Sequence, residues 1–176
     1  MDPIGPPRPP GPPQGPPFAP PKPLPPPTDP PVDYGQVMEL LRSLMTRTGK
    51  GNTIKREDLA LLASDEDVSL GMVYAAAGMH PGIRFVREHE IAFAVCTGKC
   101  QMWGAFGLVD ELLEKADVLT DADQPSFDVI PQGCLNICDE PPAIIVATSD
   151  GNGALPRCTS GDIDEALGMI FGTSAS

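Results

Sequence analysis

Residues 91–100 read Ile-Ala-Phe-Ala-Val-Cys-Thr-Gly-Lys-Cys, and residues 133–147 read Gly-Cys-Leu-Asn-Ile-Cys-Asp-Glu-Pro-Pro-Ala-Ile-Ile-Val-Ala. Each stretch places a short apolar run, typical of a buried strand, near two cysteines that are separated by three residues. The pairs are Cys96 with Cys100 and Cys134 with Cys138, and 33 residues lie between them. Because a rigid sheet holds the loops at its strand ends, we expect both pairs to face one site.

The segments around these stretches predict a small α/β domain over residues 83–176. Apolar spacing in the second half of the chain predicts two amphipathic helices, the last one capped by Thr159 or Ser160. A Ser-Asp-Gly-Asn-Gly stretch predicts a hairpin turn. The predicted order is a strand at Ile91–Val95, a helix at Phe106–Ala116, a strand at Phe127–Ile130 and a loop at Pro131–Pro142. A strand at Ala143–Ala147, the turn at Ser149–Gly153, a strand at Ala154–Cys158 and a helix after Thr159 follow.

The first half of the chain divides into two further parts. Residues 1–32 contain 17 of the 23 prolines, so we expect a disordered tail that samples polyproline II and acts as a docking tether or a spacer. Residues 33–82 predict a helical subdomain with three helices. These cover Val37–Met45, Glu57–Ala63 and a third segment that starts near Ser64, where Ser64 and Asp67 form a weak capping box.

The net charge of −12 is concentrated in residues 101–176, which contain two basic and 13 acidic residues. Nucleic-acid binding needs a basic footprint, so we do not expect it. The acidic half suits either a basic patch on a partner protein or simple solvation. No apolar run reaches the ~20 residues of a membrane span, and the N-terminus lacks the apolar segment of a secretory signal. We therefore expect a cytoplasmic protein.

Three kinds of chemistry suit four cysteines in this arrangement. A 2Fe–2S cluster takes four thiolates, two for each iron, and a structural zinc ion also takes four cysteines with similar spacing. Thiol–disulfide chemistry is less favoured, because the usual redox motif has two intervening residues and each pair here has three. The fifth cysteine, Cys158, is expected to be a small buried apolar residue.

The sequence motifs around the cysteines resemble those of a known family. Residues 68–78 read Val-Ser-Leu-Gly-Met-Val-Tyr-Ala-Ala-Ala-Gly. Three further motifs follow along the chain: Val-Cys-Thr-Gly-Lys-Cys-Gln-Met-Trp-Gly-Ala, Gly-Cys-Leu-Asn-Ile-Cys-Asp-Glu-Pro-Pro-Ala-Ile-Ile-Val and Arg-Cys-Thr-Ser-Gly-Asp-Ile-Asp-Glu-Ala-Leu. Over residues 36–171 this is similar to the thioredoxin-like 2Fe–2S ferredoxin family, which serves NADH–quinone oxidoreductase, NAD-linked hydrogenases and formate dehydrogenases as a small subunit. In that family the first pair usually has four residues between its cysteines.

The resemblance implies a thioredoxin-like, four-stranded mixed sheet with flanking helices, preceded by a small three-helix subdomain. Thioredoxin-like folds have a proline before a strand that takes a cis peptide bond, so the resemblance makes Pro142 a candidate for one. It implies one 2Fe–2S cluster on Cys96, Cys100, Cys134 and Cys138, and a flavoprotein partner that carries FMN and binds NAD(P)H. We find no Gly-x-Gly-x-x-Gly after a strand, so we expect an electron-transfer subunit without a complete active site. The alternatives are a zinc-stabilised interaction module and a stand-alone 2Fe–2S ferredoxin or redox sensor.

Overall fold

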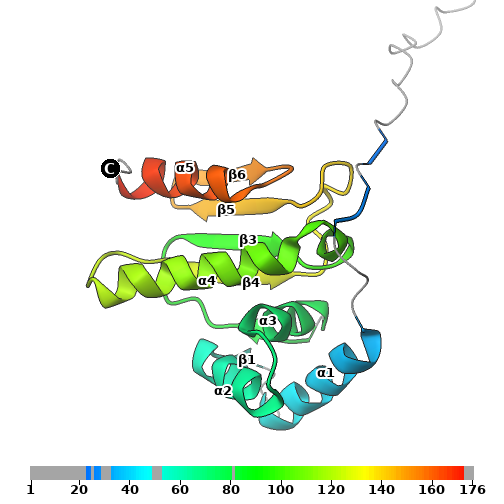
Figure 1. Ribbon diagram of the computed structural model, residues 1–176. Helices are drawn as coiled ribbons and strands as arrows, with labels where there is room; N and C mark the ends of the chain where they lie inside the picture. Colours follow the sequence, from blue (N-terminus) through cyan, green and yellow to red (C-terminus); the bar gives the residue numbers. More distant parts are fainter. Residues whose placement is uncertain (1–22, 25, 29–32, 49–52, 81, 173–176) are drawn as a thin grey trace, which may run out of the picture.

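The computed structural model describes residues 23–24, 26–28, 33–48, 53–80 and 82–172. In these ranges five α-helices and a four-stranded mixed sheet form an α/β fold (Figure 1). Most of the proline-rich segment 1–32 lies outside the described residues, so its predicted disorder stays a prediction. None of the helices in the described ranges is both long enough and apolar enough to cross a membrane.

The sheet contains β3 (Ala92–Cys96), β4 (Asp128–Gln132), β5 (Ile144–Thr148) and β6 (Gly151–Leu155). Their order is β4-β3-β5-β6. Strands β3 and β4 are parallel and are joined through α4 (Ala105–Asp121), whereas β5 runs antiparallel to both β3 and β6. The peptide bond between Pro141 and Pro142 is cis, which confirms the prediction for Pro142.

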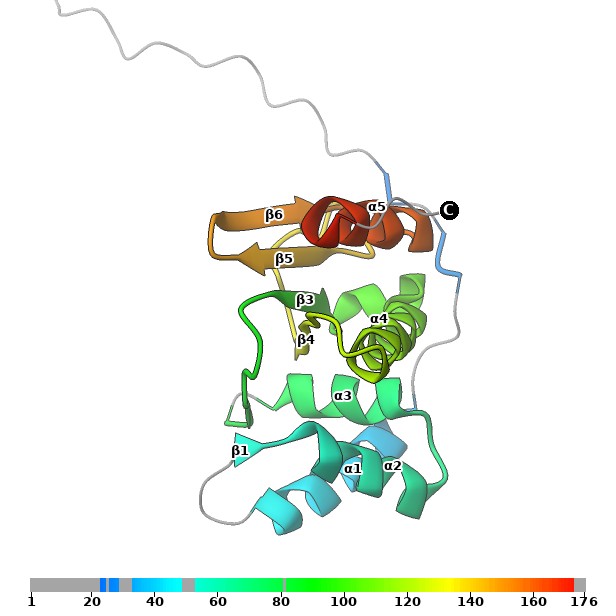
Figure 2. The same cartoon turned by 90° about the vertical axis from the view of Figure 1, so that its left-hand side faces the viewer.

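Helices α4 and α5 (Ser160–Phe171) cover one face of the sheet (Figures 1 and 2). Phe93 is fully buried, and its ring lies 4.7 Å from that of Phe127, which in turn lies 6.3 Å from Phe171. Burial of one such side chain contributes about 2 kcal/mol. The opposite face has smaller or half-buried apolar residues: Ala94, Ile130, Ile145 and Ala147.

A second layer consists of α1 (Tyr34–Thr48), α2 (Arg56–Glu66) and α3 (Leu70–Met79). The two-residue strands β1 (Thr53–Ile54) and β2 (Arg84–Phe85) pair in parallel beside these helices. Helix α3 lies between the other two helices and the β4 edge of the sheet (Figures 1 and 2). One buried apolar cluster runs through both layers, so the helices and the sheet share a core.

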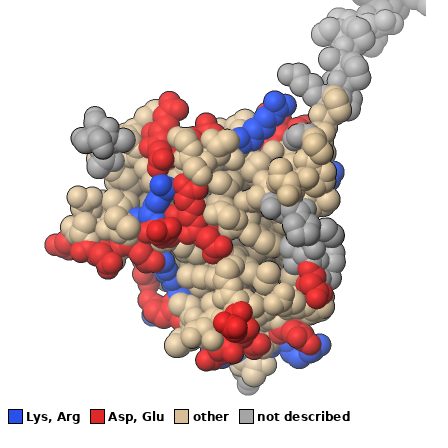
Figure 3. Space-filling view, in the orientation of Figure 1, with Lys and Arg blue, Asp and Glu red and all other residues tan. Residues whose placement is uncertain are grey.

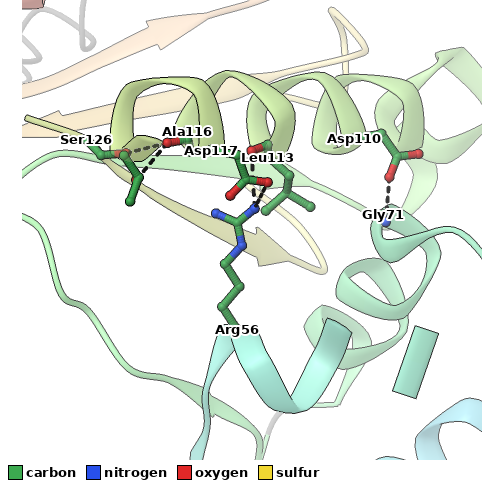
Figure 4. Close-up of polar contacts among 8 residues, drawn as sticks. Arg56, Gly71, Asp110, Leu113, Ala116, Asp117 and Ser126 are labelled. Atoms are coloured by element: carbon green, nitrogen blue, oxygen red, sulfur yellow. Dashed lines mark hydrogen bonds and ion pairs between the residues drawn. The ribbon is translucent and has the colours of Figure 1, made fainter. Parts of the chain in front are cut away.

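Polar contacts fix the helical layer to α4 (Figure 4). The backbone N–H of Gly71 donates to Asp110 Oδ1 at 2.6 Å. A side chain at position 71 would put its Cβ 2.4 Å from that oxygen, so the close approach requires glycine. The Arg56 guanidinium donates to the Leu113 carbonyl at 3.2 Å and to Asp117 Oδ2 at 2.6 Å. These bonds hold α2 and α3 against one helix.

The third helix begins later than the sequence predicted. Ser64 lies in the last turn of α2, and Asp67 ends that helix with a left-handed conformation at φ 51°. Ser69 is the actual N-cap of α3, because its hydroxyl accepts from the Met72 N–H at 3.2 Å. Ser64 and Ser69 are both residues that can cap a helix, and they lie five residues apart. The prediction of Ser64 as the cap was wrong.

Strand β4 extends through Pro131, which the sequence analysis had placed in the following loop. The Asp128 N–H donates to the Ile91 carbonyl, and the Gln132 carbonyl accepts from the Thr97 N–H. These residues therefore face β3, and Pro131 between them faces the outer edge. A strand edge tolerates proline, because no N–H is needed there.

Candidate metal centre

The two cysteine pairs lie at the same end of the sheet. Cys96 is the last residue of β3, and Cys100 lies in the 3₁₀ helix η2 (Lys99–Trp103) that follows. Cys134 and Cys138 lie in the loop between β4 and β5. The Thr97 N–H donates to the Gln132 carbonyl at 2.8 Å, so the first loop is bonded to the strand end that precedes the second.

The two loops touch at a pair of glycines. A Cβ built on Gly98 would lie 1.9 Å from the carbonyl oxygen of Gly133, which is far inside van der Waals contact. No side chain fits there without moving one loop away from the other. The sequence places Gly98 and Gly133 beside the cysteines but does not predict their contact, since only the fold brings them together.

The first pair is buried and rich in hydrogen bonds. Cys96 is 3% exposed and Cys100 is 2% exposed. A hydrogen bond from the Cys100 thiol lowers the pKa of Cys96 to about 6, against the effect of burial, and the backbone N–H groups of Leu135, Gly98 and Cys100 assist. The same hydrogen bond and burial raise the pKa of Cys100. The site thus favours a thiolate at Cys96 through donors from both loops.

The second pair is exposed. The Sγ atoms of Cys134 and Cys138 are 3.7 Å apart, and the Asn136 N–H donates to Cys134 Sγ at 3.3 Å. Asn136 has a left-handed backbone conformation with φ 59°, which turns the loop tightly around the sulfur. The hydrogen bond to Cys134 raises the pKa of Cys138, the charges of Cys134 and Cys96 raise it further, and Lys99 lowers it.

The thiols within each pair lie at a spacing that suits ligands of one metal ion. Around one metal ion with sulfurs at about 2.3 Å, neighbouring tetrahedral ligands lie about 3.8 Å apart. The 3.7 Å between Cys134 and Cys138 matches this edge, and the thiols of Cys96 and Cys100 are hydrogen-bonded to each other. Among the described residues, no group of three or more His, Cys, Asp or Glu side chains gathers as a metal site. The two loops together supply four thiols, two from each pair.

Charge around the site is mixed. Lys99, between the cysteines of the first pair, places its Nζ 6.0 Å from the centre of the Trp103 ring. Carboxylates instead gather over α4 and α5 (Figure 3), at Asp110, Glu111, Glu114, Asp117, Asp121, Asp162, Asp164 and Glu165. The acidic half of the sequence thus places much of its charge on the helices that cover the sheet, and Lys99 gives the first loop a cation.

Cys134 is one of the residues that line a groove of about 540 Å³. Its walls come from the end of α3, the β2 region and the outer edge of β4. Among the described residues that line it, the charged or titratable side chains other than Cys134 are His80 and Arg87, and none is a carboxylate. A second cavity, of about 520 Å³, lies between α2, α3 and the start of β4, on the other side of the fold from the cysteine loops.

The remaining thiol, Cys158, is buried as expected, but it follows β6 instead of ending it. Its N–H donates to the Pro142 carbonyl at 2.8 Å, and burial raises its pKa to about 12. Cys158 therefore lies after β6 and belongs to neither of the two cysteine pairs.

No protein-family model matches this chain, and no curated protein matches it closely enough to be counted as a relative.

Proposed function

We propose that this protein is an electron-transfer subunit that binds one 2Fe–2S cluster through Cys96, Cys100, Cys134 and Cys138. The single observation that carries the proposal is the placement of two close thiol pairs at one end of a mixed sheet, with both loops in contact. The β3–α4–β4 and β5–β6–α5 order supports a thioredoxin-like fold for this part and α1–α3 as its helical subdomain.

One observation favours iron and sulfide over zinc. The backbone N–H groups of Leu135 and Asn136 donate to cysteine sulfurs. Hydrogen bonds to sulfur raise the reduction potential of iron–sulfur centres, so these donors have a direct use in electron transfer.

A bound 2Fe–2S cluster supplies one-electron chemistry, and the chain provides placement and electrostatics. Cys96, whose pKa is lowered, is ready to bind as a thiolate. Gly98 and Gly133 let the two loops approach each other, and Lys99 adds a positive charge beside the anionic site. No group in the site is placed as a general acid or base in this proposal.

The partner in this proposal is a larger flavoprotein that carries FMN and binds NAD(P)H, in a cytoplasmic oxidoreductase complex. The exposure of Cys134 and Cys138 supports this, because electron transfer needs a short path to the surface. The groove beside Cys134, which lacks carboxylates among its described lining residues, offers a contact surface for such a partner.

Anaerobic purification followed by iron, sulfide and zinc analysis tests the proposal. We expect a brown protein with one cluster per chain and a rhombic EPR signal after reduction. A colourless protein with one zinc ion per chain would instead establish the zinc-stabilised interaction module. A Cys134→Ser variant that retains a full and unaltered cluster would refute the ligand set, with Cys158→Ser as the matched control that should keep the cluster.

A further inference from the structure

The end of the proline-rich segment contacts the helix that contains Cys100. The Thr28 N–H donates to the Met102 carbonyl at 2.9 Å, across 74 residues of sequence. Met102 lies near the end of η2, where carbonyl groups have no partner within the helix. The bond therefore satisfies an acceptor that a short helix leaves open, and it joins the stem of the tail to the cysteine end.

The described part of this stem, residues 23–24 and 26–28, has one apolar side chain that is withdrawn from solvent. Leu24 is half-buried, whereas Pro23, Pro26, Pro27 and Thr28 are exposed. In both views the stem runs beside the start of α4, next to the end of the sheet where the cysteine loops lie (Figures 1 and 2). A half-buried leucine and a directed hydrogen bond together make a docked segment.

The composition of the stem determines how it can bind. Residues 23–28 read Pro-Leu-Pro-Pro-Pro-Thr, so only Leu24 and Thr28 have a backbone N–H. Such a segment is held in polyproline II before it binds, and it loses little conformational entropy on docking. Of these two N–H groups, that of Thr28 donates to a carbonyl of η2.

We propose that the outer surface of η2 is a docking site for a polyproline II segment, and that the chain's own Leu24 and residues 26–28 occupy it. The docked stem covers part of the helix that contains Cys100. A protein that approaches the cysteines over η2 must displace this stem or bind it. The proposal goes beyond electron transfer and does not depend on which metal the cysteines bind.

Hydrogen exchange on the full-length protein tests the docking directly. The prolines contribute no amide, so a peptide that spans residues 23–28 reports on Leu24 and Thr28 alone. We expect exchange at Thr28 to be slowed about fivefold relative to the same peptide free in solution, as one net hydrogen bond allows. Exchange at the rate of the free peptide would overturn the proposal.

A matched pair of variants separates the bond from the side chain. Thr28→Pro removes the N–H and keeps polyproline II, whereas Thr28→Ala keeps the N–H. The chain has a single tryptophan, Trp103, which directly follows Met102, so its fluorescence reports on η2 alone. With the iron content matched, we expect acrylamide to quench Trp103 more strongly in Thr28→Pro than in Thr28→Ala or wild type. Equal quenching in all three proteins would contradict the proposal.

Discussion

The two cysteine pairs have different surroundings. Cys96 and Cys100 are buried in β3 and η2, whereas Cys134 and Cys138 are exposed in an irregular loop. The first pair therefore belongs to the packed core, and replacing one of its cysteines should lower the stability of the fold. The second pair contributes its thiols and little packing. The comparison shows that one site can combine a rigid half with a half that is open to a partner.

The largest expected effect is on the contact that joins the two halves. Gly98→Ala forces a Cβ against the Gly133 carbonyl, which lies 1.9 Å away, so one loop has to move. We expect a loss of about 3 kcal/mol in unfolding free energy and a loss of bound iron. Urea unfolding and iron analysis measure both.

Gly107→Ala is the matched control for Gly98→Ala. A Cβ on Gly107, which is exposed on α4, meets nothing within 4 Å. Alanine should stabilise that helix by about 0.5–1 kcal/mol and leave the iron content unchanged. Equal iron contents in the two variants would show that the loops do not need their close contact.

The second prediction separates the pairs themselves. Cys100→Ser buries a hydroxyl where the thiol is 2% exposed, so the metal-free protein should lose about 2 kcal/mol of stability. Cys138→Ser, in the exposed pair, should change it by less than about 0.5 kcal/mol. Both variants should lose the cluster. Urea unfolding under reducing conditions is the measurement, and equal losses of stability would remove the distinction between the halves.

The third prediction concerns the charge between the cysteines of the first pair. Lys99→Gln removes the cation that lowers the pKa of Cys138. Without it, the reduced and more negative site should be less stable, and the reduction potential should fall by roughly 20–40 mV. Redox titration followed by EPR measures the change. Lys55→Gln, at the start of α2, is the control and should leave the potential unaltered.

The smallest effect is expected at Asp110, which binds α3 and neither cysteine pair. Burial raises the pKa of Asp110 above 3.8, partly offset by the Gly71 N–H. The folded state therefore holds the proton more tightly, and stability falls as the pH rises through the window above 3.8. The Asp110→Asn variant has no such carboxylate, so its unfolding free energy relative to wild type should rise between pH 4 and pH 7, as measured by urea unfolding. A difference in unfolding free energy that does not change with pH, or an altered cluster spectrum, would contradict this.

The sequence predicted the order of elements over residues 83–176 well and their edges less well. The run at Ile91–Val95 was long and apolar enough to place β3 to within one residue. The final hairpin was displaced, because β6 begins at Gly151 and its Gly-Asn-Gly-Ala-Leu sequence has no apolar alternation that fixes register. Register there depends on pairing with β5, where Thr148 lies opposite Gly151.

The sequence predicted which four cysteines form the candidate site, but not how deeply each pair is buried or which groups bond to the sulfurs. Spacing within the chain groups Cys96 with Cys100 and Cys134 with Cys138, since only three residues separate the members of each pair. The difference in burial between the pairs depends on η2, a short 3₁₀ helix with no apolar periodicity of its own. The Leu135 N–H that reaches Cys96 is a backbone group, and every residue type other than proline has one.

The two edges of the sheet resist aggregation in different ways. At β4, Pro131 presents no N–H to an incoming strand, and α3 packs along that side. At β6, the exposed residues Gly151, Asn152 and Gly153 have low strand propensity, which weakens any template for a further strand. We therefore expect the folded chain not to polymerise through its sheet at high concentration, even though α4 and α5 cover only one of its faces.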